Sequence, residues 1–219
     1  MTALTNLLDS LRQAAPTERD KGTRFEELTL FYLRNEPSYR ELYAQVWSYG
    51  DWAAEQGLDQ RDVGIDLVAQ TAATGEFHAI QCKFYAADYK LQKSDIDSFF
   101  TASGQKPFVQ RIIVSTTQHW SEHAEKALLN QQTPVLKLEL FDLEKSQIDW
   151  SSYQLAQAQQ VPILKPQKVL REHQQSAVKK VVNGFKTVDR GKLIMACGTG
   201  KTFTSLKIAE QVAGSGKLV

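Results

Sequence analysis

The sequence predicts an α/β fold in which a mixed β-sheet is flanked by helices, followed by the first elements of a second α/β unit. Three observations lead to this prediction. Segments with apolar residues at helical spacing alternate with short strand-like runs over residues 4–141. A stretch rich in Gln and Ala, broken by Pro162 and Pro166, then interrupts this alternation. Beyond it, an apolar run leads into a glycine-rich turn and a last helix.

Two helices are expected first. The leucines of the opening segment recur at helical spacing, and Pro16 ends it. A second helix should run from about Gly22 to Arg34, with Pro37 beyond its end. The expected buried positions are Leu4, Leu7, Leu8 and Leu11 in the first helix and Phe25, Leu28, Phe31 and Tyr32 in the second.

Strands and helices should then alternate. Residues 42–50 read as a strand, and two further strands flank a turn at Thr74–Gly75 and form a hairpin. A helix should begin at the N-cap Ser94 and stop at Gly104, and another should begin at the N-cap Ser121. The remaining expected elements are a buried strand at 109–116, the helix over 121–132 and a final strand at 134–141.

The shift in composition towards Gln and Ala indicates a domain boundary. We expect a first domain at 1–152, a linker at 153–169 and a second unit at 170–219. In the second unit, residues 170–185 have the spacing of an amphipathic helix. A strand at 191–196, a glycine-rich loop and a further helix should follow.

Charge is distributed unevenly, although the formal net charge is only +1. Residues 165–219 carry eleven Lys and Arg against three Asp and Glu, whereas the rest of the chain carries fifteen against twenty-two. Because Lys and Arg supply most of the nonspecific affinity for DNA, the acidic first part is expected to bind DNA weakly by itself. Another part of the protein should therefore bring this acidic part to DNA.

Several other classes of site and location are disfavoured. Cys82 and Cys197 lie far apart, without a CxxC pair or a histidine at ligand spacing, so neither a structural zinc site nor a disulfide framework is expected. The chain opens without a signal-peptide pattern and contains no apolar stretch as long as a membrane span. We therefore expect a cytoplasmic protein that does not bind membranes.

The hairpin carries three polar side chains that suit metal-assisted chemistry. If its turn is centred between Ala73 and Thr74, Asp66 lies opposite Gln81, and Lys83 follows on the same face. Opposed Cβ atoms lie about 5 Å apart, so a carboxylate, an amide oxygen and an ammonium can hold a hard divalent cation and a phosphate oxygen. The alternative is an ordinary half-solvated hairpin. Against it stands the position of Asp66 within an apolar run, where aspartate is depleted.

These residues resemble the Mrr-like branch of the PD-(D/E)xK restriction endonucleases, in which glutamine replaces the second acid to give a QxK element. Gln81–Lys83 matches that element, and Gly64–Ala69 matches the strand that holds the metal-binding aspartate. Gly22–Glu26 matches the Gly-x-x-Phe-Glu pattern of the first core helix, with Glu26 as the functional acid and Glu27 as the adjacent second candidate. The resemblance covers about residues 20–145 and implies a restriction-endonuclease-like fold.

The resemblance also implies a Mg²⁺-dependent endonuclease that cuts double-stranded DNA without sequence specificity of its own. Asp66, the side-chain oxygen of Gln81 and the backbone carbonyl of Cys82 would bind Mg²⁺. Lys83 would orient or deprotonate the attacking water, and Glu26 would bind a second metal ion or orient water.

The loop in the second unit resembles motif I of superfamily 2 helicases and translocases, which implies a RecA-like P-loop domain binding ATP with Mg²⁺. Glycines leave backbone N–H groups open, Lys201 supplies an ammonium for the phosphates, and Thr202 supplies a hydroxyl for Mg²⁺. Met195 stands where the general pattern has its first glycine. The alternative is an ordinary helix start after a glycine turn. The expected ATP-binding residues are Gln174, which matches the adenine-sensing Q motif, Gly198, Thr199, Gly200, Lys201 and Thr202.

A Mrr-like nuclease joined to such a motor resembles the single-polypeptide Type ISP restriction-modification enzymes. This resemblance implies that ATP-driven translocation delivers the nuclease to DNA. The rest of the motor, an adenine methyltransferase and a target-recognition domain would lie outside these residues. We therefore expect the ATPase to be incomplete within residues 170–219.

Two other interpretations stay open. Because Gln81 replaces an acid, the nuclease fold could be an inactive DNA-binding or regulatory module on a motor. A repair helicase or ATPase without nuclease activity is the third interpretation, but it leaves Glu26, Asp66 and Lys83 unexplained. Metal-dependent cutting of DNA distinguishes the nuclease from the inactive module.

Overall fold

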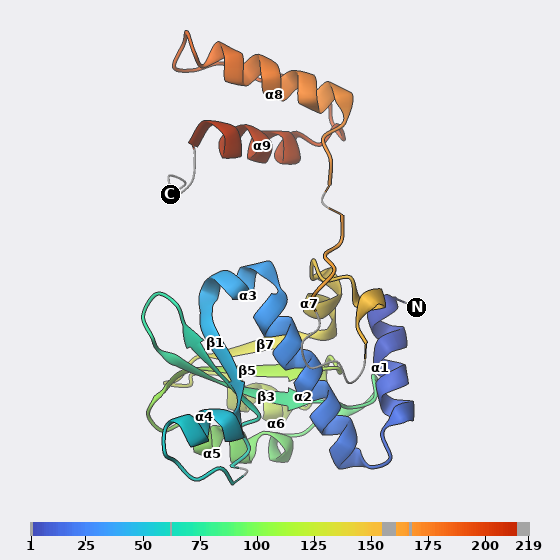
Figure 1. Ribbon diagram of the computed structural model, residues 1–219, viewed down its shortest axis with the longest axis vertical. Helices are drawn as coiled ribbons and strands as arrows, with labels where there is room; N and C mark the ends of the chain where they lie inside the picture. The colour runs from blue at the N-terminus through green and yellow to red at the C-terminus, as the bar shows by residue number, and fades with distance from the viewer. Residues whose placement is uncertain (1, 62, 155–160, 167, 214–219) are drawn as a thin grey trace. The chain divides into compact units, whose positions relative to one another are not determined.

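The chain divides into two compact units, Met1–Lys165 and Pro166–Val219, in the computed structural model (Figure 1). The division falls inside the segment 153–169 that the sequence assigns to a linker. Residues 155–160 and 167 of that segment lie outside the described residues. Within the described part, no helix is long and apolar enough to cross a bilayer. The described residues are 2–61, 63–154, 161–166 and 168–213.

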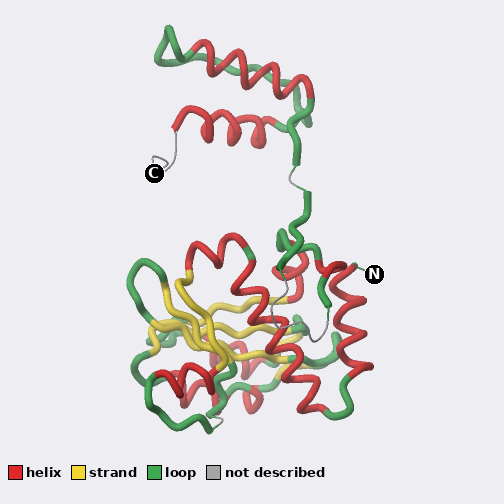
Figure 2. The backbone as a smooth tube through the Cα atoms, in the orientation of Figure 1, coloured by secondary structure: helices red, strands yellow, loops and turns green. Residues whose placement is uncertain are grey.

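A five-stranded sheet forms the centre of the first unit, and Figure 2 shows its strands surrounded by helices. In spatial order the strands are β1 (Tyr43–Ser48), β2 (Leu67–Thr71), β3 (Phe77–Lys83), β5 (Phe108–Ser115) and β7 (Val135–Glu139). β1, β2 and β3 pair antiparallel, whereas β3, β5 and β7 pair parallel. The prediction of a mixed sheet flanked by helices is therefore confirmed.

The two N-terminal helices cover one face of this sheet. α1 (Ala3–Ala14) buries the four leucines that its spacing predicts. α2 (Glu18–Asn35) contributes Phe25 and Leu28 to the same core, together with Ile80 from β3. Burying a side chain of this size contributes about 1.5–3 kcal/mol, so this core holds both helices on the sheet.

The second helix differs from its prediction at two points. It begins at Glu18 rather than near Gly22, because the Thr17 hydroxyl caps it by accepting the Asp20 N–H at 3.1 Å. Its buried stripe includes Leu33, whereas the expected Phe31 is only partly buried. Burial on this helix follows the position of the sheet, which the spacing of apolar residues alone does not fix.

Three short helices cover the opposite face. They are α4 (Tyr49–Glu55), α5 (Asp97–Ser103) and α6 (Glu122–Leu128). Trp52, Phe99 and Ala124 from these helices share a second core with Val68 and Ile113 of the sheet. These strand residues alternate with those that face α1 and α2, so the sheet is buried on both faces.

Several predicted boundaries were wrong. Ser94 does not cap a helix but lies in the 3₁₀ turn Lys93–Asp95, which Gln92 caps, although the following helix does stop at Gly104. The helix that Ser121 caps is confirmed, but it ends at Leu128 rather than continuing to residue 132.

The strand predicted over 42–50 covers only Tyr43–Ser48, and the last strand ends at Glu139. The short helices that continue the chain at these places are α3 (Pro37–Leu42), α4 and α7 (Leu140–Lys145). Helices this short carry too few periodic positions to be recognised from sequence, and they depend on tertiary packing.

The β2–β3 hairpin has the predicted register. Leu67 pairs with Ile80 and Gln70 with Phe77, as a turn centred between Ala73 and Thr74 requires, and the paired ladder ends at Leu67, before the expected pair of Asp66 with Gln81. The strand itself begins at Leu67, one residue after Asp66. Asp66 is nevertheless tied to the ladder, because its backbone N–H donates to the Ile80 carbonyl at 3.0 Å.

Gly64 directs the chain into this hairpin. Its φ is +88°, in the left-handed region that favours glycine. A Cβ at this position would lie 2.7 Å from Ser98 Oγ and 3.1 Å from the Phe99 nitrogen. The close approach to the start of α5 therefore requires glycine two residues before Asp66.

The second unit contains α8 (Glu172–Gly184) and α9 (Lys201–Ala213), as predicted. The predicted strand at 191–196 is absent from the described residues, and Ile194 is 90% exposed. A strand needs a partner for its backbone N–H and C=O groups, and the described residues of this unit offer none. Residues 214–219 of the predicted unit lie outside the described part.

We predict that Gly64→Ala lowers the free energy of unfolding by about 1–3 kcal/mol, because alanine is strained at this φ and its Cβ meets α5. Gly50→Ala is the matched control. Gly50 lies in α4 with open space around a Cβ, and alanine there should be neutral or stabilising. Urea unfolding of both variants checks the prediction, which fails if the two substitutions have equal effects.

Candidate active site at the end of the β2–β3 hairpin

The carboxylate of Asp66 is fixed to the neighbouring strand. Its Oδ2 accepts the backbone N–H of Cys82 at 2.6 Å, a short, charge-assisted hydrogen bond. Together with the bond from the Asp66 N–H to Ile80, this contact holds the aspartate at one place along β3. The hairpin therefore positions the first predicted site residue through backbone groups.

Gln81 is buried, with 3% of its surface exposed. Its amide nitrogen donates to the Gly64 carbonyl at 3.2 Å. Its amide oxygen has no hydrogen-bond partner among the described residues. A buried acceptor without a donor costs free energy, and such an oxygen suits a hard cation such as Mg²⁺.

Charges converge on Cys82, between Gln81 and Lys83. Burial raises the pKa of the Cys82 thiol well above its usual value, and the carboxylates of Asp66 and Glu26 raise it further. The charge of Lys83 acts in the opposite direction. Two acids and one lysine therefore lie close enough to act electrostatically on a single residue at the end of β3.

The predicted site residues approach from two sides of β3. Cys82 packs against the core under α1 and α2, the side from which Glu26 comes. By strand alternation, Gln81 and Lys83 lie on the other face. The oxygen donors available at the strand end are two carboxylates and one amide. Among the described residues there is no cluster of three or more His, Cys, Asp and Glu that could hold a metal ion.

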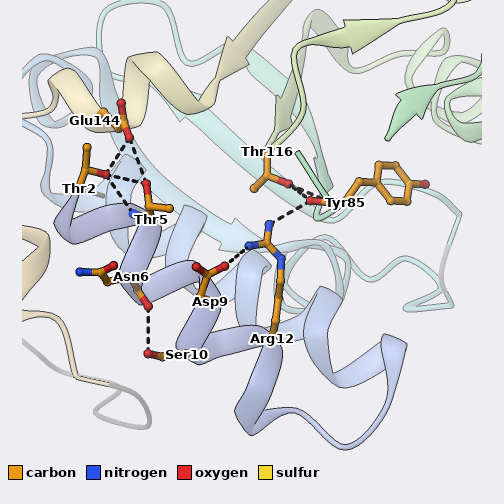
Figure 3. A network of polar contacts seen from close by, with 9 residues as sticks. All are labelled: Thr2, Thr5, Asn6, Asp9, Ser10, Arg12, Tyr85, Thr116 and Glu144. Carbon is orange, nitrogen blue, oxygen red and sulfur yellow. Dashed lines mark hydrogen bonds and ion pairs between the residues drawn. The ribbon is translucent and has the colours of Figure 1, made fainter. Parts of the chain in front are cut away.

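The chain directly after Lys83 is held by groups that the sequence did not indicate. The Phe84 ring stacks on Phe25 of α2, with centroids 5.0 Å apart. The guanidinium of Arg12 in α1 lies over the Phe84 ring, 4.6 Å from its centroid. The same group donates a hydrogen bond to the Tyr85 carbonyl at 3.0 Å (Figure 3). Arg12 belongs to no motif, so sequence spacing gave no signal for it.

The glycine-rich loop of the second unit adopts a conformation suited to its glycines. Gly198 and Gly200 have φ values of +76° and +80°. The buried amide of Gln174 donates to the Thr199 carbonyl at 2.9 Å, and a Cβ at Gly200 would overlap this amide. Lys201, the first residue of α9, donates to the Met195 carbonyl at 3.4 Å.

The predicted ATP-binding residues are therefore adjacent in the structure. Gln174 meets the loop itself, and Lys201 folds over it. Thr202 is exposed at the start of α9, where helix N–H groups favour phosphate.

Two family models match the chain. A model of the Mrr catalytic type, described as "Restriction endonuclease", matches residues 34–160, which include Asp66 and Lys83 but not Glu26. A model described as "Type III restriction enzyme, res subunit" matches residues 167–218, which include the glycine-rich loop. A comparison with curated proteins gives no match.

Two solved structures are similar to the chain. The "ATP-dependent Type ISP restriction-modification enzyme LlaBIII bound to DNA" is 37% identical with a TM-score of 0.74. The match covers 94% of this chain but only 13% of that one. The "DNA modification-dependent restriction endonuclease AspBHI" is 18% identical with a TM-score of 0.45, over 65% of this chain and 34% of that one.

The family match spans more than half of the chain, and it contains the hairpin whose geometry is described above. The second match adds a helicase-like segment, and LlaBIII is similar across both units. The chain therefore belongs to the Mrr-type restriction endonuclease family, and a segment that matches the res subunit of Type III restriction enzymes follows its nuclease-type unit.

Proposed function

We propose that the first unit is a Mg²⁺-dependent endonuclease of the PD-(D/E)xK superfamily that hydrolyses DNA phosphodiester bonds without sequence specificity of its own. One observation carries the proposal: the Cys82 N–H fixes the Asp66 carboxylate at 2.6 Å, and the buried amide oxygen of the adjacent Gln81 has no hydrogen-bond partner among the described residues. A buried acceptor without a donor costs free energy, which a purely structural role does not explain. A divalent cation bound to this oxygen would remove that cost.

Each residue has a distinct role in this proposal. Asp66, with the Gln81 amide oxygen and the Cys82 carbonyl, would hold Mg²⁺, which would supply positive charge for the phosphate and acidify the attacking water. Glu26 would bind a second metal ion or orient water. The Cys82 N–H fixes the Asp66 carboxylate before any ion arrives. Lys83 would orient the water and offset the negative charge that builds on the phosphate.

We further propose that the second unit begins an ATP-driven DNA translocase that delivers the nuclease. LlaBIII is described as ATP-dependent and bound to DNA, and this chain is similar to 13% of its length. A methyltransferase and a target-recognition domain in the remainder of the polypeptide are part of the same proposal. The acidic composition of the nuclease unit supports it, because such a unit gains little DNA affinity from its own charge. The cytoplasmic location stays a prediction.

The competing function is an inactive nuclease fold that binds DNA or regulates the motor. Gln81 favours this alternative, because an amide brings less negative charge to a metal site than a carboxylate. It predicts translocation on DNA without cutting under any divalent ion.

We predict that Asp66→Ala or Lys83→Ala lowers metal-dependent DNA cleavage by the full-length protein by at least about 100-fold, the loss typical of removing a group that stabilises transition-state charge. ATP hydrolysis should be retained. Gel assays of plasmid cleavage and a phosphate-release assay measure the two activities. Undiminished cleavage would remove the nuclease assignment from these residues.

Glu26 and Glu27 supply a matched pair for the same assays. Glu27 is exposed, and its charge raises the pKa of Tyr153 after the larger effect of burial, so it does not point to Cys82. Glu26→Gln should impair cleavage, whereas Glu27→Gln should not. Equal effects would show that α2 contributes no specific acid.

We predict that Gln81→Glu strengthens Mg²⁺ binding and weakens the metal-free fold. The substitution removes the donor to Gly64 and adds a charge next to Cys82, whose N–H holds the Asp66 carboxylate, at a cost of about 1–3 kcal/mol without metal. Thermal unfolding at rising Mg²⁺ concentration should show a larger increase in Tm for Gln81→Glu than for the wild type. The exposed Gln45→Glu is the control, and an identical Mg²⁺ response in both variants contradicts the ligand role.

We predict that Lys201→Ala weakens ATP binding by about tenfold or more, since a hydrogen bond to a charged group contributes about 1.5–3 kcal/mol. Lys207→Ala, on the same helix and paired with Glu210, is the control. Fluorescent-nucleotide titration of the full-length protein measures both. Comparable affinities for the two variants would argue against a phosphate-binding loop.

A further inference from the structure

Two stacked tyrosines follow the candidate site. The rings of Tyr85 and Tyr89 lie with centroids 4.1 Å apart and planes 29° from parallel. Tyr89 is 36% exposed, so the pair ends in an aromatic surface that solvent reaches. Neither ring takes part in the proposed chemistry.

The pair lies on the same face of the sheet as Gln81 and Lys83. Phe84 packs with the core under α1 and α2, whereas Tyr85 packs with the opposite core. The alternation of β3 therefore continues beyond Lys83. Two residues of extended chain span about 7 Å, so Tyr85 is a close neighbour of the lysine.

The backbone that carries the pair is firmly anchored. The Thr116 hydroxyl accepts the Tyr85 N–H at 2.9 Å and donates to its carbonyl at 2.7 Å, and Arg12 donates to the same carbonyl. Figure 3 shows the Tyr85 ring pointing away from Arg12 while its carbonyl faces α1. The Tyr89 carbonyl accepts from Thr117 at 2.6 Å.

The second ring is also fixed, because the Tyr89 hydroxyl donates to Asp95 at 3.1 Å. A ring held in place before binding loses little conformational entropy when a ligand stacks on it.

A cation follows Tyr89 directly in the chain. Lys90 is exposed in the short strand β4 (Lys90–Leu91), which pairs with β6 (His119–Trp120). Within the described part of the chain, Lys90 forms no ion pair. Aromatic faces and ammonium groups together bind bases and phosphates in single-stranded nucleic acid.

We propose that the Tyr85–Tyr89 pair is a stacking platform for an unpaired base of the DNA strand being cut, with Lys90 on a neighbouring phosphate. A base inside a duplex is covered by its neighbours, so an aromatic face engages it only where the strand is locally unpaired. This proposal rests on the proposed nuclease function and specifies the form of DNA that the nuclease cuts. The nuclease acts preferentially on locally unpaired DNA beside Lys83.

The platform is tested by measuring the affinity of the protein for two DNA duplexes of the same sequence. One duplex is fully paired, and the other contains a short unpaired stretch with the fluorescent base 2-aminopurine. A chelator removes divalent metal ions and so prevents cleavage. The wild-type protein should prefer the unpaired duplex and quench its fluorescence. Tyr89→Leu should lose about tenfold in affinity for that duplex and nothing for the paired one. Tyr89→Phe, which keeps the ring, should retain the preference.

Two further variants serve as controls. Phe141→Leu removes an exposed aromatic ring of α7 and should change neither affinity. Lys90→Ala should lower the affinity for both duplexes by the same factor, and it should reduce the salt dependence of binding by about one phosphate contact. Urea unfolding of Tyr89→Leu and Tyr89→Phe checks that both fold.

The proposal of a stacking platform is contradicted if the wild type binds both duplexes with equal affinity. It is also contradicted if Tyr89→Leu lowers the affinity for both duplexes by the same factor. Because the assay measures binding without cleavage, its outcome is independent of the nuclease assignment, which the Asp66 and Lys83 variants test.

Discussion

The register of the β2–β3 hairpin is the constraint on which the candidate site depends. It places Asp66 where its carboxylate accepts the Cys82 N–H, and it decides which face Gln81 and Lys83 occupy. A slip of one residue would turn both side chains towards α1 and α2. Gly75, with a φ of +73°, allows the turn at one end of the hairpin, and Gly64 allows the close approach to α5 at the other.

The N-terminal helices act on the same strand from the other side. Phe25 of α2 stacks on Phe84, one residue after Lys83, and the charge of the adjacent Glu26 acts on Cys82. Arg12 of α1 adds a hydrogen bond to the next residue, Tyr85. Core packing and the placement of the site residues therefore depend on the same helix, because α2 buries Phe25 and carries Glu26 next to it.

The two units differ in their balance of acidic and basic residues. The nuclease unit is acidic and keeps glutamine where a third acid would add still more negative charge. We expect its own affinity for DNA and for metal to be reduced accordingly, so the proposed delivery by a motor and the proposed binding of a locally unpaired strand would each compensate for weak affinity. Tyr85 lies on the same face of the sheet as Lys83, and Tyr89 stacks on its ring, where such a strand would be held.

The sequence by itself determined the fold class, the long helices, the hairpin register and the glycine-rich loop. Each of these depends on local spacing or on a turn residue, which a single sequence displays. Only the tertiary structure decided the short helices α3, α4 and α7, the cap at Gln92 and the absence of a strand at 191–196 among the described residues. It also decided the roles of Arg12 and Thr116 and the stacking of Tyr85 on Tyr89. These features require partners distant in sequence, whose side chains and backbone groups meet only when the sheet has formed.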